Sequence, residues 1–307
     1  MALIYYLIFP GFVFTALVGL LATWIDRKVS ARVQWRQGPP WFQPFMDILK
    51  LLGKETIVPE NASKMIFFGA PLVGLAVITL VSTILGLAST NPQITFVGDL
   101  IVVLYLLTIP STALILGGSA SGNPIAAIGS SREMKLILAY ELPFIIAVFT
   151  LISKVGSISL GSILQYQASH GMLIGSVSGC LAFVVVLLVI QAKLGVAPFD
   201  IAEAEQEIMA GPLLEYSGPA LAVFRLTKAM LYWTLPLLMQ ILFLGGINFT
   251  SVVGILWFIL KYVIILTLII LIKNTNPRIR IDQAVRFFWG PVVVIAILAF
   301  VLSLFGW

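Results

Sequence analysis

Residues 65–89 read MIFFGAPLVGLAVITLVSTILGLAS and contain no charged side chain. A run of this kind supplies the roughly 20 apolar residues that a helix needs to cross a bilayer core about 30 Å thick. Similar runs recur at roughly 3–25, 98–118, 134–153, 172–192, 220–244, 252–272 and 287–306. The sequence therefore predicts an all-α, polytopic transmembrane bundle of about eight spans, with residues 1–307 forming a single membrane domain.

The composition excludes several other classes of protein. The 307 residues are 60% hydrophobic and 10% charged, and the mean hydropathy is +1.08. These values do not fit a soluble globular domain, a disordered chain or a coiled coil. A single cysteine, Cys180, cannot form an internal disulfide, and it cannot hold an iron–sulfur cluster or a structural zinc alone. We therefore expect no metal or cofactor in this chain.

The basic residues predict an orientation. Sixteen of the 18 Lys and Arg residues lie on one side of the predicted spans, Lys154 lies on the other side, and Lys261 lies inside a span. The positive-inside rule places the basic connections in the cytoplasm and both termini outside the cell membrane. Topology accounts for the net charge of +5, so no nucleic-acid partner is expected. The opposite connections, including 154–171, are short and nearly uncharged.

The longest basic connection contains a predicted surface helix. Phe45, Ile48, Leu49 and Leu52 follow the i, i+3, i+4, i+7 spacing of one apolar stripe. Such a helix lies on the membrane surface. The pattern does not decide between a simple anchor in the lipid bilayer and a direct contact with a partner protein.

A second basic-side connection is rich in acids, which are Asp200, Glu203, Glu205, Glu207 and Glu215. If the segment is helical from Phe199, Glu203 and Glu207 share a face and repel each other. Close carboxylates of this kind can hold and pass protons. The alternative is a solvated acidic loop whose charges pair with nearby arginines.

Two charges lie deep within predicted spans, away from the span ends. Glu141 is about 9 Å into the fourth span at roughly 1.5 Å per residue. Lys261 lies near the middle of the seventh span. An intramembrane charge is costly, and it marks a polar cavity, an ion route or a structural pair between helices. We expect Glu141 to have a partner inside the bundle, and Lys261 either to have an acidic partner or to lose its proton. Asp99, at the start of the third span, is expected to cap a helix.

Three long motifs on the basic side resemble one family. They are Asp26-Arg-Lys with Arg32–Pro39 and Gln43–Lys50, then Ala197–Glu207, and finally Pro277–Gln283. The family is the membrane subunit, including NADH dehydrogenase subunit 1, that joins the two arms of respiratory complex I and of related membrane-bound nickel–iron hydrogenases. Segments Ser121–Glu133, Ala139–Glu141 and Gly211–Pro219 are similar to the branch with formate hydrogenlyase, energy-converting hydrogenases and archaeal sulfur-reducing complexes.

The resemblance implies a non-catalytic subunit of an oxidoreductase complex. It would anchor a ferredoxin-fed module of the hydrogenase-like or sulfur-reducing kind, whose large and small subunits bind on the cytoplasmic face. It would also couple electron transfer in that module to proton or sodium movement through antiporter-like membrane subunits. The nickel–iron centre and iron–sulfur clusters would belong to partners. The implied docking residues are Asp26, Arg27, Arg32, Arg36, Arg278, Arg280 and Asp282. The implied proton path contains Glu141, Asp200, Glu203, Glu205, Glu207, Glu215 and Lys261.

Three alternatives remain open at this stage. The chain could form the quinone chamber of a complex I-type enzyme, or it could be a membrane scaffold that conducts no ions. A stand-alone secondary transporter would also carry intramembrane charges, but it should show an internal repeat, which this sequence lacks.

Overall fold

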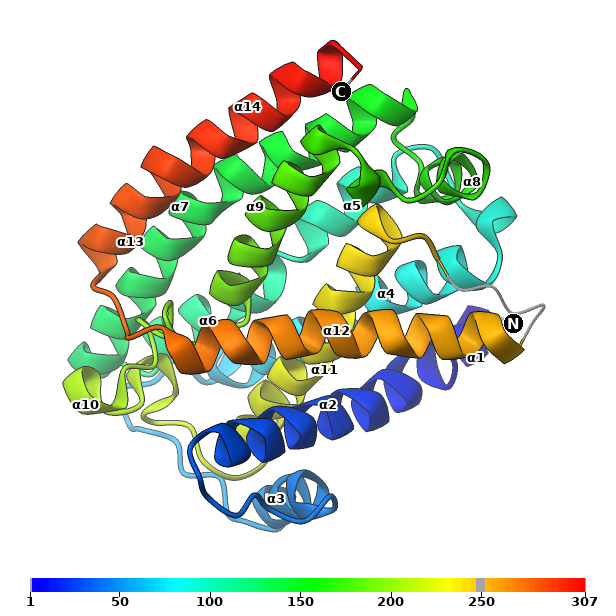
Figure 1. The fold of residues 1–307 in the computed structure, drawn as a ribbon. Coiled ribbons are helices and arrows are strands. Elements are labelled where there is room, and N and C mark those ends of the chain that lie inside the picture. Colours follow the sequence, from blue (N-terminus) through cyan, green and yellow to red (C-terminus); the bar gives the residue numbers. More distant parts are fainter. Residues whose placement is uncertain (1, 247–251, 307) are drawn as a thin grey trace.

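The computed structural model describes residues 2–246 and 252–306, with the backbone alone for residues 2 and 205. Within these residues the chain is helical and contains no strand (Figure 1). Seven helical stretches are long and apolar enough to cross a membrane, and one shorter apolar helix accompanies them. The membrane helices are α1 (Ala2–Leu7) with α2 (Phe12–Val33), α4 (Lys64–Thr90), α5 (Asp99–Leu106) with α6 (Ile109–Ala120), α7 (Pro124–Val155), α9 (Val177–Lys193), α11 (Gly218–Phe243), α12 (Val252–Thr275), and α13 (Ile281–Phe287) with α14 (Val293–Leu304). This arrangement confirms the predicted polytopic helical bundle.

Three further helices lie between these stretches. The predicted surface helix is present as α3 (Gln43–Leu52), and a short helix, α10 (Glu205–Ile208), lies in the acidic loop. Helix α8 (Leu160–His170) occupies the connection that was expected to be a short loop. Its buried residues Leu160, Ile163, Leu164 and Gln167 follow the i, i+3, i+4, i+7 spacing of a helix face. The helical signal was therefore present, but in a segment too short and too polar to cross a membrane.

Helix ends depend on capping residues more than on hydropathy. Helix α7 begins at Pro124, ten residues before the predicted start of the fourth span. The Asn123 side chain accepts a hydrogen bond from the Ile125 backbone N–H at 2.8 Å, and proline suits the first helical position because it has no N–H to satisfy. Hydropathy locates the apolar part of a helix, and this helix extends well beyond it.

At two of the prolines within membrane helices, a tyrosine hydroxyl binds the backbone carbonyl that loses its helical donor. Pro236 in α11 cannot donate to the Tyr232 carbonyl oxygen, which instead accepts a hydrogen bond from the Tyr262 hydroxyl of α12 at 3.1 Å. In the same way, the Tyr216 hydroxyl donates to the carbonyl that Pro71 leaves free in α4. In a membrane, where water cannot satisfy the carbonyl, these phenols join neighbouring helices.

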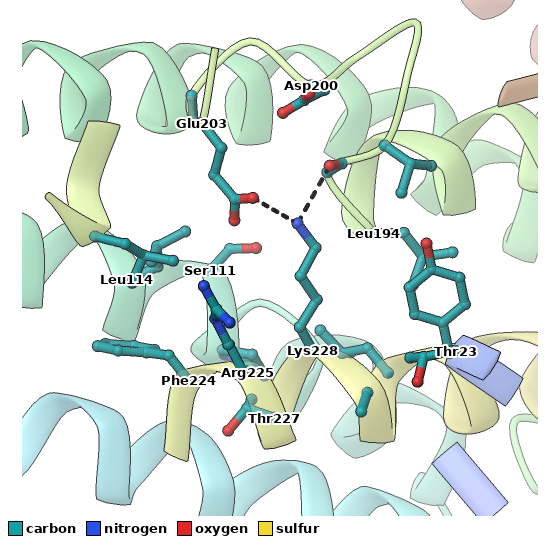
Figure 2. Close-up of a pocket in the computed structure, with 18 of the residues that line it drawn as sticks. Thr23, Ser111, Leu114, Leu194, Asp200, Glu203, Phe224, Arg225, Thr227 and Lys228 are labelled. Atoms are coloured by element: carbon teal, nitrogen blue, oxygen red, sulfur yellow. Dashed lines mark hydrogen bonds and ion pairs between the residues drawn. The ribbon is translucent and has the colours of Figure 1, made fainter. Parts of the chain in front are cut away.

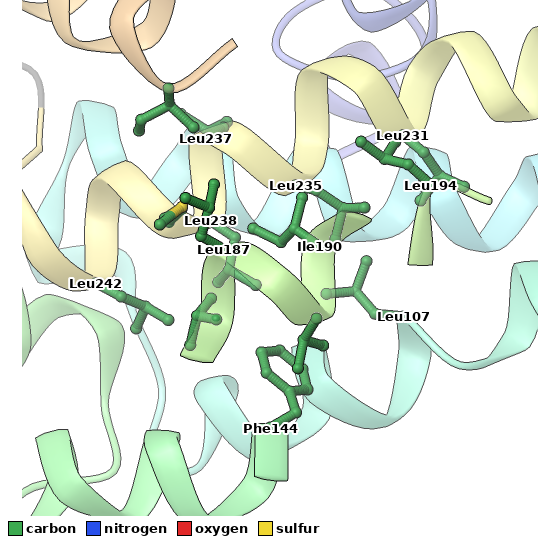
Figure 3. Packing of buried hydrophobic residues seen from close by; sticks show 14 of the residues in the cluster. Leu107, Phe144, Leu187, Ile190, Leu194, Leu231, Leu235, Leu237, Leu238 and Leu242 are labelled. Carbon is green, nitrogen blue, oxygen red and sulfur yellow. The ribbon is translucent and has the colours of Figure 1, made fainter. Parts of the chain in front are cut away.

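Helix α11 runs through the middle of the bundle. All residues from 229 to 243 are buried, and the helix packs against α2, α4 and α9. Leu235 and Leu238 of α11 meet Leu187 and Ile190 of α9 and Phe144 of α7 in this core (Figure 3). Because Gly19 in α2 has no side chain, α2 and α11 can pack closely against each other. A Cβ at this position would lie 2.4 Å from the Ala229 carbonyl oxygen of α11. The core therefore fixes α11 relative to the helices that form the site.

The two ends of the bundle differ in content. Figure 1 shows both termini and α8 toward one end, here called the terminal end. Helices α3 and α10 and the connection from α12 to α13 lie toward the opposite end, here called the basic end. The loops with the three family-like motifs therefore gather at one end of the molecule.

Candidate functional site

A large cavity opens at the basic end. Its volume is about 740 Å³, within the range typical of ligand pockets. Helices α2, α3, α6, α7, α9, α11 and α12 and the acidic loop contribute to its walls (Figure 2). Charged side chains line it from every side: Asp26, Arg27, Asp47, Glu133, Lys193, Asp200, Glu203, Arg225, Lys228 and Lys273. This cavity is the candidate functional site.

Glu141 has a buried partner, as its position in the membrane required. The Lys193 ammonium of α9 lies 3.0 Å from the Glu141 carboxylate of α7, and only 2% of the Lys193 side chain is exposed. The lysine also lies over the rings of Tyr140 and Phe144, with Nζ 4.8 and 5.0 Å from the ring centroids. These aromatic faces stabilise the cation where water is excluded. The pair connects the cavity wall to the interior of α7.

A second ion pair crosses the cavity. The Lys228 ammonium of α11 lies 2.7 Å from the Glu203 carboxylate of the acidic loop, and it also donates to the Gly195 carbonyl oxygen (Figure 2). Glu133 of α7 is buried and lies within electrostatic reach of Glu203, Lys228 and Lys193. At a rise of about 1.5 Å per residue, Glu133 and Glu141 are about 12 Å apart along α7. The charged groups thus form a series from the acidic loop into α7, in which Glu133 lies within electrostatic reach of both ion pairs.

Glu133 is a cavity residue that the sequence pattern did not predict. It lies one residue before the predicted fourth span and beside Arg132, which is typical of a basic loop. Because α7 starts at Pro124, Glu133 is instead well inside a helix. The sequence does contain a sign of the earlier start, because an asparagine followed by a proline, as at Asn123-Pro124, is typical of the beginning of a helix. With the helix start placed there, Glu133 would have been predicted to lie within the helix.

The acidic loop is not helical from Phe199, so the condition under which two of its acids would share a helix face is not met. The helix begins only at Glu205, so Glu203 and Glu207 do not share a face. The Glu207 carboxylate lies 2.5 Å from Arg132, and the Asp200 carboxylate lies 2.7 Å from Arg278. Basic side chains supplied by other helices and loops overcome the local helical pattern. These two pairs fit the alternative interpretation, an acidic loop whose charges pair with nearby arginines.

Burial and nearby charges act differently on these two acids. Burial raises the pKa of Asp200, and Glu203 adds to this effect, although Lys228 and Arg278 act against it. The pKa of Glu207 is lowered by the hydrogen bond and the charge of Arg132. Asp200 is therefore the loop acid that binds a proton more readily. Glu215 lies farther along the loop and accepts a hydrogen bond from Asn123 at 2.5 Å.

Asp26 is inside the structure and not on the docking surface. It is buried on α2, where its carboxylate lies 2.6 Å from the Lys273 ammonium of α12 and accepts a hydrogen bond from the Tyr232 hydroxyl at 3.3 Å. The pair joins α2, α11 and α12 at the basic end. The sequence predicted only a topology-setting charge at Lys273, although this side chain closes one side of the cavity.

The other residues assigned to docking lie near or on the surface. Arg27 pairs with Asp47 of α3 at 2.8 Å. Burial raises the pKa of Asp47, but hydrogen bonds from Arg27 and Gln43 outweigh this effect and lower it. The remaining members are exposed at the basic end, and they are Arg32, Arg36, Arg278, Arg280 and Asp282. They form the candidate docking surface.

Among the described residues assigned to the proton path, Asp200 and Glu203 line the cavity and Glu141 adjoins it through Lys193, whereas Glu207, Glu215 and Lys261 do not line it. The Lys261 ammonium donates to the Leu244 carbonyl oxygen at 2.6 Å, just beyond the end of α11, and it does not line the cavity. The side chain of Glu205 lies outside the described part of the structure. Among the described residues, no group of three or more His, Cys, Asp or Glu side chains is arranged to hold a metal ion.

The sequence matches the family described as NADH dehydrogenase over residues 6–304. This chain belongs to the NADH dehydrogenase family. The matched residues include every residue that lines the cavity. Like other members, it is a membrane subunit of a respiratory complex of the complex I type that contains several subunits.

Individual relatives support this assignment. An NADH-quinone oxidoreductase subunit of Thermomicrobium roseum is 35% identical, and the alignment covers 94% of this chain and 92% of the relative. The corresponding NADH-quinone oxidoreductase subunit of Thermus thermophilus is 34% identical, with 93% and 83% covered. Among solved structures, a chain of the membrane-bound sulfane sulfur reductase, an archaeal respiratory membrane complex, matches with a TM-score of 0.86 at 30% identity, covering 95% and 96% of the two chains. This family member therefore shares its fold with subunits of two kinds of respiratory complex.

Proposed function

We infer that this subunit couples electron transfer in a peripheral module to proton or sodium movement across the membrane. The observation that carries the proposal is the charged series from Asp200 and Glu203 through Lys228 and Glu133 to the buried Glu141–Lys193 pair. Close titratable groups share and exchange protons, and a charge change at one group alters the proton affinity of its neighbours. A redox event near the cavity would shift this series, which leads toward the membrane interior.

The proposed module is ferredoxin-fed and reduces protons or a sulfur compound. Its large and small subunits, with the nickel–iron centre and the iron–sulfur clusters, bind to the exposed basic residues at the basic end, and antiporter-like subunits adjoin this chain in the membrane. The whole-chain similarity to the sulfane sulfur reductase subunit supports this branch. Quinone reduction is the second candidate, because relatives such as those of Thermomicrobium and Thermus belong to NADH-quinone oxidoreductases.

Replacement of Glu141 tests the coupling. Glu141→Gln preserves the shape and can still accept a hydrogen bond from Lys193, but it cannot exchange a proton at physiological pH. We expect normal assembly of the complex and at least a tenfold loss of ion translocation into inverted vesicles. The matched control is Glu60→Gln, which changes an exposed acid away from the cavity. Wild-type pumping by an assembled Glu141→Gln complex would exclude Glu141 from the path and leave a scaffold role for the pair.

Cysteine labelling tests the proposed orientation and docking together. In a Cys180→Ala background, single cysteines at Gln37 and Thr275 mark the basic end, and one at Asn91 marks the other side of the bundle. An impermeant reagent should reach only Asn91 on intact cells. In inverted vesicles it should reach Gln37 and Thr275, and more readily once the peripheral subunits are stripped. Labelling of Gln37 from outside would reverse the orientation, and labelling unaffected by stripping would argue against docking there.

A further inference from the structure

One cation in the cavity has no carboxylate partner. Four of the five basic side chains that line the cavity form ion pairs of 2.6 to 3.0 Å, and these pairs are Arg27–Asp47, Lys193–Glu141, Lys228–Glu203 and Lys273–Asp26. Within the described part of the chain, Arg225 has no carboxylate within ion-pair distance. Asp47 influences it only at longer range. Arg225 is therefore the positive charge that the cavity leaves unpaired.

The Arg225 side chain rises from α11 into the cavity, beside Lys228 and Phe224 (Figure 2). The side chain is exposed. A guanidinium offers five N–H donors in a planar fork, which matches the oxygens of a phosphate or a carboxylate in a bidentate manner. The nearby Lys228 ammonium is already paired with Glu203, so the guanidinium of Arg225 is the group that is left to bind an anion. The geometry favours an anionic group with several oxygens.

The helix that carries Arg225 and three other helices contribute an apolar wall to the cavity. This wall is formed by Leu20 of α2, Pro44 and Ile48 of α3, Leu114 of α6, and Leu221 and Phe224 of α11. Helix α3 packs against α11 while Leu49 and Leu52 of its apolar stripe remain exposed. An amphipathic helix with such a stripe lies at the boundary between lipid headgroups and acyl chains. The apolar wall therefore includes residues of the helix that carries Arg225 and of α3, whose exposed apolar stripe suits the level of the headgroups.

We propose that the cavity holds the phosphate headgroup of a membrane lipid, bound at Arg225, with the lipid chains along the apolar wall toward α3. The phosphate supplies the missing anion, and the chains cover the apolar wall, so one molecule satisfies both features. An acidic side chain of a partner would satisfy the charge but not the apolar wall. A quinone would cover the apolar wall but would bring no negative charge to the arginine.

Phosphorus counting tests the proposal on the intact complex. The complex is purified in mild detergent, washed extensively and extracted, and phospholipid is then counted by phosphorus NMR and by native mass spectrometry. We expect Arg225→Gln to lose one phospholipid per copy of this subunit. Arg225→Lys, which keeps the charge, should retain most of it. Arg286→Gln, an exposed arginine of α13 outside the cavity, is the matched control and should lose none.

A second arm separates a lipid from free phosphate. Delipidated complex is offered phosphatidylglycerol in detergent or inorganic phosphate at the same concentration, and only the lipid should bind in an Arg225-dependent manner. Equal binding of inorganic phosphate would show a solute site and overturn the proposal. Unchanged phospholipid counts in Arg225→Gln would also overturn it, whether accompanied by loss of a bound quinone or by release of a partner subunit.

Discussion

The two ends of the bundle satisfy their buried polar side chains in different ways. At the basic end, carboxylates meet ammonium and guanidinium groups of other elements, and all six ion pairs among the described residues involve residues of this end or of the cavity beneath it. Toward the terminal end the described residues form no ion pair, and two of the buried polar side chains bind backbone groups of other helices. Asp99 accepts from the Leu160 N–H at 2.8 Å, and Gln167 donates to the Ile241 carbonyl at 2.8 Å.

This difference separates positioning from proton chemistry. A side chain bound to a backbone N–H or carbonyl has a partner that neither moves nor titrates, so it fixes one geometry. A pair of titratable side chains has more than one protonation state, and its proton occupancy depends on nearby charges. We therefore expect changes at the basic end to alter both stability and coupling, and changes at the terminal end to alter stability alone.

The largest expected effect comes from breaking the Glu141–Lys193 pair on one side. Lys193→Met leaves a carboxylate without its partner in the membrane interior, and removal of one partner of a buried pair costs about 3–5 kcal/mol. The thermal stability of the purified complex should fall accordingly, or the subunit should fail to assemble. Adding Glu141→Leu removes the orphaned charge and should restore much of the stability but not the coupling. Equal stability of the single and double variants would show that the pair is not energetically linked.

The sequence identified the functional candidate Glu141 correctly as a charge that needs a partner, but it did not identify the residue that forms the ion pair with it. Intramembrane position alone identified Glu141, because a charge inside an apolar run has few explanations. Its partner lies 52 positions later, at the end of α9, where a lysine also satisfies the positive-inside rule. The same rule accounted for Lys228 and Lys273. The positive-inside rule was therefore a sufficient explanation for these lysines, and it gave no sign that they form ion pairs with acids of other helices or of the acidic loop. Those pairs depend on the packing of α2, α7, α9, α11 and α12.

Lys261 illustrates the opposite case. Its position predicted an acidic partner if it kept its proton, yet the described structure gives it the Leu244 carbonyl at the end of α11. The last turn of any helix leaves carbonyls without helical donors, and a lysine can satisfy one of them and interact favourably with the helix dipole. The available backbone acceptors depend on where the neighbouring helix ends, which hydropathy does not determine.

A smaller effect is expected at the terminal end. Asp99→Ala removes the acceptor that caps the start of α8, and loss of a cap costs about 0.5–2 kcal/mol. Asp99→Asn keeps a side-chain oxygen and should lose less. The melting temperature of the complex should fall in Asp99→Ala, while the ratio of ions moved to electrons transferred stays at the wild-type value. A change in that ratio would contradict the division between the two ends, because it would give a capping residue a part in coupling.

The smallest effect is expected at the ion pair that ties α3 to α2. The Arg27 side chain is 47% exposed and Asp47 is 26% exposed, so water and salt screen their attraction. Exposed pairs contribute roughly 0.2–1 kcal/mol, and Asp47→Asn should therefore lower the unfolding free energy by less than about 1 kcal/mol in low salt and by almost nothing in roughly 1 M salt. Thermal unfolding of the complex at the two salt concentrations measures the difference, with Glu60→Gln as a control for general salt effects. A loss that persists in high salt would show that the pair is desolvated in the assembled complex. In that case Asp47 would belong with the buried pairs of the cavity, and the boundary between the surface and the coupling region would lie at α3.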